Sequence, residues 1–123
     1  MKQVDLQHMA VGQLVERFVA VTLAQDEALL LDEHTNFKRL FEEMEAVKAE
    51  LKSRDGDQRR ALLRLYDHPN AQVRLKAVKA TLAVAPDLAR SALEAIANSK
   101  EYPQAGEAGM SLINLDRGIF KPT

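Results

Sequence analysis

The stretch of residues 62–74 reads LLRLYDHPNAQVR and is followed by apolar positions at Ala77, Val78 and Thr81. Its leucines recur at helical spacing before the Pro-Asn corner, and its apolar residues do so again after it. We interpret this pattern as two amphipathic helices joined at a corner. Such a pair leaves one apolar face uncovered, so it is expected to stack on neighbouring pairs.

The same pattern of inward positions recurs 31 residues later, where Leu62 corresponds to Leu93 and Ala77 to Ala108. An internal repeat of this kind indicates two copies of one helical hairpin. The predicted organisation is a single helical-repeat domain with a long capping hairpin (1–56), a HEAT-like hairpin (57–85), a second HEAT-like hairpin (86–117) and a tail (118–123).

These patterns predict an all-α fold of about six helices in three stacked antiparallel hairpins, a HEAT/armadillo-like α–α superhelix. The expected boundary signals are an N-cap at Asp5, an N-cap at Asp32 or Thr35, a left-handed end at Gly56, an N-cap at Asn70 and a first turn at Pro86. The third helix is expected over about 57–66. The apolar face of the fifth helix is expected to comprise Leu88, Ala92, Leu93 and Ile96.

Composition places the chain among ordinary globular proteins. It has 123 residues, of which 46% are hydrophobic and 28% charged. Cysteine is absent, which excludes disulfides, zinc–thiolate sites and thiol catalysis. Charged residues interrupt the apolar run between Leu14 and Leu31, and Asp5, His8 and Gln13 interrupt the first apolar segment. We therefore predict a cytoplasmic protein with no membrane association.

Several motifs along the chain resemble known families. They are LVERF (14–18), the region from Asn36 to Phe41, HPN (68–70) with VRLKA (73–77), and YPQAGEAGM (102–110). The hairpin 62–84 resembles HEAT-like repeats, and nearly the whole chain resembles DUF2019, a family of small bacterial proteins described as a domain of unknown function. The resemblance implies stacked helical hairpins and no known activity, catalytic residue or cofactor. By fold-level analogy, toxin-neutralising or regulatory binding would suit such a protein.

Residues that could carry chemistry lack the spacing that chemistry needs. The three histidines do not fall on one helix face as metal ligands would, and the segment Asp32–His34 is interpreted as a polar connection. Glu42, Glu43 and Glu45 lie outside the apolar stripe and are expected to be hydrated carboxylates. The serines lack a nucleophile elbow. We predict no catalytic residue, no metal site and no cofactor.

Charge is distributed unevenly. Residues 26–50 carry eight acidic and three basic side chains, whereas residues 57–80 carry two acidic and six basic ones. The candidate partner or anion surface comprises Arg60, Arg64, Lys76 and Lys79, all expected on outer helix faces. Converging cations of this kind could hold phosphates. However, no aromatic residues interleave with them and the net charge is −1, which disfavours nucleic acid.

Arg74 is expected to differ from these cations, because its helical position is on the inward side. A buried guanidinium needs partners, and Asp67 and the corner carbonyl groups are the candidates. We therefore predict that Arg74 and Asp67 form a structural clamp between repeats.

The prediction for function is a non-enzymatic protein-binding module with an unidentified protein partner. The alternative is a small enzyme, or an anion- or nucleic-acid-binding module that uses the four cations. The tail residues Ile119 and Phe120 are expected to fold back over the core, since an exposed Phe gains nothing. A homo-oligomeric contact through this tail or the first helix stays open.

Overall fold

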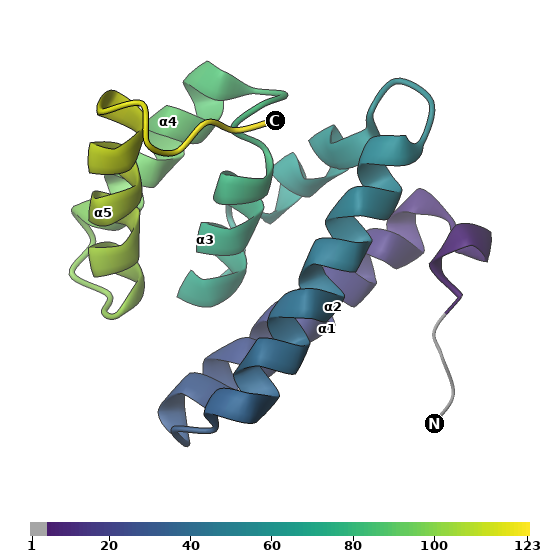
Figure 1. Ribbon diagram of the computed structural model, residues 1–123, viewed down its shortest axis with the longest axis horizontal. Coiled ribbons are helices and arrows are strands. Elements are labelled where there is room, and N and C mark those ends of the chain that lie inside the picture. The colour runs from purple at the N-terminus through teal and green to yellow at the C-terminus, as the bar shows by residue number, and fades with distance from the viewer. Residues whose placement is uncertain (1–4) are drawn as a thin grey trace. The chain divides into compact units, whose positions relative to one another are not determined.

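The computed structural model describes residues 5–123, and these residues contain helices and no strand (Figure 1). The elements are η1 (Leu6–His8), α1 (Val11–Leu30), α2 (His34–Ser53), η2 (Gln58–Leu65), α3 (Ala71–Ala80), α4 (Pro86–Ala97) and α5 (Gln104–Asp116), where η denotes a 3-10 helix. The predicted all-α fold class is confirmed. The chain forms two compact units, a first unit that ends at Ala61 and a second unit, Leu62–Thr123.

The first unit is built on the pair of helices α1 and α2, which pack along one another. Its core consists of the apolar stripes that the periodicity predicts: Leu14, Val15, Phe18 and Val21 from α1, with Leu40, Met44, Val47 and Leu51 from α2. Phe41, which the spacing also assigns to the stripe, lies at its edge and is exposed.

The predicted starts of these two helices are wrong. Asp5 precedes the short helix η1, and α1 begins after Ala10, whose backbone N–H donates to Oε1 of Gln13 at 2.8 Å. Helix α2 begins after Glu33 without a side-chain cap, so neither Asp32 nor Thr35 has that role. Preference for a residue type at an N-cap is a local tendency, and the turn that joins the hairpin overrides it here.

That turn is a Schellman motif, in which a left-handed residue closes the end of a helix. Asp32 has φ of 56°, and the N–H of Glu33 donates to the carbonyl of Ala28 at 2.9 Å. The N–H of Asp32 donates to the carbonyl of Leu29 at 3.3 Å. The chain therefore reverses within three residues after α1.

In the second unit, α4 packs against both α3 and α5. One cluster of buried residues forms its core: Leu75, Val78, Leu82, Ala89, Leu93, Ile96 and Ala108. The prediction for α4 is wrong at one position, because Leu88 is 62% exposed whereas its neighbour Ala89 is fully buried. Leu88 lies in the first turn of α4, where no preceding turn of helix shields it.

The equivalence of positions 31 residues apart is borne out in burial. Leu62 and Leu93 are both fully buried, as are Ala77 and Ala108. The predicted helix over 57–66 is nevertheless the 3-10 helix η2 and not an α-helix. Asn70 caps α3 as predicted, because its Oδ1 accepts from the N–H groups of Gln72 and Val73.

The tail follows a second Schellman motif at the end of α5. Gly118 has φ of 71°, and the N–H of Ile119 donates to the carbonyl of Asn114 at 2.9 Å. Phe120 then packs against the core cluster of the second unit, so the predicted fold-back is confirmed for this residue. Ile119 remains exposed.

Candidate protein-binding surface

Three consecutive leucines lie at the end of the α1–α2 hairpin. Leu30 is 80% exposed and Leu31 is 59% exposed, and Leu29 beside them is also exposed. Leu30 lies on the side of α1 opposite its buried stripe, and Leu31 follows the last residue of that helix. An exposed cluster of large apolar side chains on a folded unit is typical of an interaction site.

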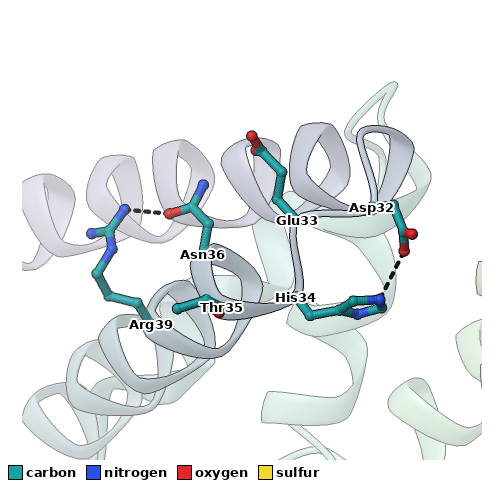
Figure 2. A pocket seen from close by; sticks show the side chains of 6 residues that line it. All are labelled: Asp32, Glu33, His34, Thr35, Asn36 and Arg39. Atoms are coloured by element: carbon teal, nitrogen blue, oxygen red, sulfur yellow. Dashed lines mark hydrogen bonds and ion pairs between the residues drawn. The ribbon is translucent and has the colours of Figure 1, made fainter.

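Polar residues follow the leucines along the chain, from the turn into α2. An open depression of about 650 Å³ is lined by Asp32, Glu33, His34, Thr35, Asn36 and Arg39. Figure 2 shows His34 beside Asp32, with 2.8 Å between Nε2 and Oδ1, and Arg39 donating to Oδ1 of Asn36 at 2.7 Å. We call residues 29–39, the leucines and this polar rim together, the hairpin end.

The rim is held in place by an ion-pair network that joins both helices. Glu43 on α2 accepts from Arg17 on α1 and from Arg39 on its own helix, each at 2.8 Å. Glu43 is one of the three carboxylates considered from the sequence as an acid or base, and both of its oxygens are occupied by arginines. Its contacts are those of a residue that ties α1 to α2.

The four cations predicted as one surface differ in their surroundings. Arg60 and Arg64 are exposed and form no ion pair within residues 5–123. Lys76 does not point outward as predicted, because its side chain is only 8% exposed. Its Nζ donates to Glu107 at 2.8 Å, and Lys79 donates to the same oxygen at 3.1 Å.

Glu107 on α5 explains the burial of Lys76. Burial of Glu107 opposes its ionisation, but Lys76 and Lys79 together outweigh that effect and lower the pKa of the carboxyl below its usual 4.5. Glu107 was not among the residues predicted from the sequence to matter. A signal was present, since Lys76 and Glu107 lie 31 residues apart, which is the offset of the repeat.

Arg74 joins the corner of one hairpin to the next. Its guanidinium donates to the carbonyls of His68 and Pro69 at 2.9 and 3.0 Å and also binds Glu101, which precedes α5. Among the described residues no ion pair links Arg74 to Asp67, which is exposed. The acidic partner of Arg74 is thus Glu101, a residue that local spacing around the corner could not identify.

A buried amide pair also connects α3 and α5. Nε2 of Gln104 donates to Oε1 of Gln72 at 3.0 Å, and both side chains are buried. Gln72 and Gln104 are the second and first residues of their helices. Sequence reasoning missed this pair, because a glutamine near a helix start is ordinarily exposed.

Within residues 5–123, no group of three or more His, Asp or Glu side chains has the arrangement of a metal site. In the same part of the chain, no helix is long and apolar enough to cross a bilayer.

Comparison with known proteins identifies relatives of unassigned function. The model of a family described as "Domain of unknown function (DUF2019)" matches residues 12–116. The crystal structure of the protein RPA1889 from Rhodopseudomonas palustris CGA009 is similar, with 55% sequence identity and a TM-score of 0.95. The match covers 98% of this chain and 100% of that one. No curated protein matches the sequence.

Proposed function

The chain belongs to the DUF2019 family, and on that premise we propose that it is a non-enzymatic protein-binding module whose binding surface is the hairpin end. The observation that supports this most is the exposure of Leu30 and Leu31. Complete burial of a leucine is worth about 1.5–3 kcal/mol. Two neighbouring leucines that the first unit leaves uncovered therefore offer a partner a substantial apolar contact.

The polar rim would orient a partner that binds to the leucines. Charged and amide groups around an apolar centre are the usual anatomy of a protein–protein interface. At the hairpin end, Glu33 and Arg39 supply both signs of charge within the polar rim. The partner is therefore expected to present an apolar hollow with a polar border.

The absence of catalysis is part of the proposal. The carboxylates best placed to act, Glu43 and Glu107, are each bound by two cationic side chains. A general acid or base must be able to reach a substrate proton, and these contacts compete with that reach. Toxin-neutralising and regulatory binding both fit a module of this kind.

The anion-binding alternative is less well supported. Lys76 and Lys79 are both engaged by Glu107, which leaves Arg60 and Arg64 as the exposed cations of the predicted group. Affinity for a phosphate backbone rises with the number of phosphates neutralised. Two arginines alone therefore provide little affinity for a phosphate backbone.

The test is affinity capture from an extract of the native cell with quantitative mass spectrometry. The bait is the unaltered chain, a Leu30→Ser variant, or a Leu88→Ser variant as the matched control. Leu88 is an exposed leucine of the second unit, so both substitutions remove the same kind of surface. We expect one stoichiometric protein with the unaltered chain and Leu88→Ser, and its loss with Leu30→Ser.

Equal recovery with both variants would contradict the placement of the binding surface at the hairpin end. Salt-sensitive retention of the chain on DNA or heparin, without any captured protein, would favour the anion-binding alternative.

A further inference from the structure

Helix α5 has a second apolar face that its own unit leaves uncovered. Its inner side is buried through Ala105, Ala108 and Ser111. The opposite side carries Met110, which is 59% exposed, and Ile113, which is 46% exposed. At 100° per residue these two residues share one face.

Two glycines make hollows beside these large side chains. A Cβ atom added to Gly109 would meet nothing within 4 Å, and one added to Gly106 would approach only the ring of Tyr102, at 3.9 Å. Gly109 lies in the interior of α5, where glycine is destabilising by roughly 0.5–1 kcal/mol relative to alanine. Neither the packing nor the backbone angles of the second unit require glycine at these positions.

The order of large and small residues along this face is self-complementary. We propose that a second copy of this chain docks here, with α5 against α5, antiparallel about a twofold axis that passes between residues 109 and 110. In this register Gly109 lies opposite Met110 of the second copy, and Met110 lies opposite its Gly109. Ile113 of each copy then fills the hollow over Gly106 of the other. A twofold contact of this kind uses the same surface patch twice.

The charges at the two ends of the face agree with this register. Arg117 follows α5, is exposed, and forms no ion pair among the described residues. The antiparallel arrangement brings it to Tyr102 and Glu101 of the second copy. Tyr102 is exposed, and half of the Glu101 side chain is exposed although it binds Arg74. A guanidinium gains from both an aromatic ring and a carboxylate. This complementarity favours a second copy over an unrelated helix.

One helix crossing is a small interface. A specific interface generally buries about 1,000 Å² or more in total, and a single pair of short helices lies near that limit. The proposed dimer is therefore weak, and it should be sought at concentrations from about 10 µM to about 1 mM.

The first experiment is sedimentation equilibrium of the unaltered chain and of Gly109→Leu. The matched control is Gly12→Leu in α1, because a Cβ at Gly12 also meets nothing within 4 Å. We expect concentration-dependent dimers for the unaltered chain and for Gly12→Leu. In Gly109→Leu the dissociation constant should rise about tenfold or more, since the leucines hold the two helices apart. A chain that stays monomeric at the highest concentration, or a dimer unchanged by Gly109→Leu, would overturn the proposal.

A second experiment stays informative if Gly109→Leu folds poorly. The chain contains no cysteine, so Gly109→Cys introduces a single thiol close to the proposed axis. A disulfide needs Cα atoms about 4.4–6.8 Å apart, which close packing at glycine permits. Under mild oxidation we expect covalent dimers from Gly109→Cys and few from Gly12→Cys. Equal cross-linking of the two variants would count against the twofold contact.

Discussion

The two units of this chain differ in the length of their helices and in the side chains that form their cores. The first unit has two α-helices of 20 residues each, and apolar side chains such as Phe18 and Met44 dominate its core. The second unit has α-helices of 10, 12 and 13 residues. Its core contains many alanines, and polar pairs join its helices through Gln72 with Gln104 and Lys76 with Glu107.

The difference follows from helix length. A long helix pair gains its stability from an apolar stripe repeated over many turns. Short helices offer fewer apolar contacts, and each alanine buries less apolar area than a larger side chain. Specific polar contacts therefore contribute more to how the short helices align with one another. The first unit should therefore be most sensitive to cavities, and the second to the loss of polar partners.

The largest effect is expected in the core of the first unit. Phe18 is fully buried, so Phe18→Ala removes a large side chain and leaves a cavity. We expect the free energy of unfolding in urea to fall by about 3–5 kcal/mol. A loss below about 1 kcal/mol would show that the hairpin does not depend on a close-packed stripe, and the contrast between the units would fail.

The next effect concerns the ion pairs of the second unit. Glu107→Ala removes a partner of the buried Lys76 and of Lys79. We expect a loss of about 1–3 kcal/mol, below the value for a fully buried pair because 40% of the Glu107 side chain is exposed. The matched control is Glu94→Ala, which removes an exposed pair with Arg90 and should cost less than about 0.5 kcal/mol.

The same carboxylate predicts a pH dependence. The pKa of Glu107 is lower in the folded state than its usual 4.5, so the unfolded chain binds the proton more readily. Its contribution to stability is thus complete above pH 4.5 and is lost as the pH falls through the lower, folded-state value. Urea unfolding of Glu107→Gln should show a smaller decline over that range. Identical declines in the two proteins would contradict this assignment.

A smaller loss is expected at the junction between the repeats. Arg74→Met removes two hydrogen bonds to corner carbonyls and the contact with Glu101. We expect the free energy of unfolding to fall by about 1–2 kcal/mol, with capture of a partner unchanged. A variant as stable as the parent in urea would exclude a clamp at this position.

The smallest expected effect compares the two Schellman turns. The turn after α5 has glycine at its left-handed residue, whereas the turn after α1 has Asp32 with φ of 56°. Asp32→Gly should stabilise the first unit by about 0.5–1 kcal/mol, because glycine adopts this backbone conformation without a Cβ penalty. Unfolding in urea measures the difference, and a destabilised variant would imply that the contact of Asp32 with His34 matters more.

The sequence alone predicted the local features well. The apolar stripes and the cap at Asn70 follow from interactions between residues a few positions apart. Gly56 is left-handed, with φ of 76°, but it does not end α2 as predicted, because α2 stops at Ser53 with Arg54 in an extended conformation.

The internal offset of 31 also predicted that Leu62 and Leu93 are both buried. Of the candidate residues, Arg74 was correctly placed at the corner carbonyls, but its predicted acidic partner, Asp67, was wrong and Glu101 has that role.

The helical segments and the apolar stripe of most helices could be read from the sequence, because periodicity depends on neighbours along the chain. The burial of Lys76 against Glu107 and the exposure of Leu88 emerged from the folded chain alone. Whether a side chain is covered, and whether a buried charge meets its opposite, depends on atoms that folding brings in from distant segments. The binding surface proposed at the hairpin end rests on the exposure of Leu30 and Leu31 in the folded chain.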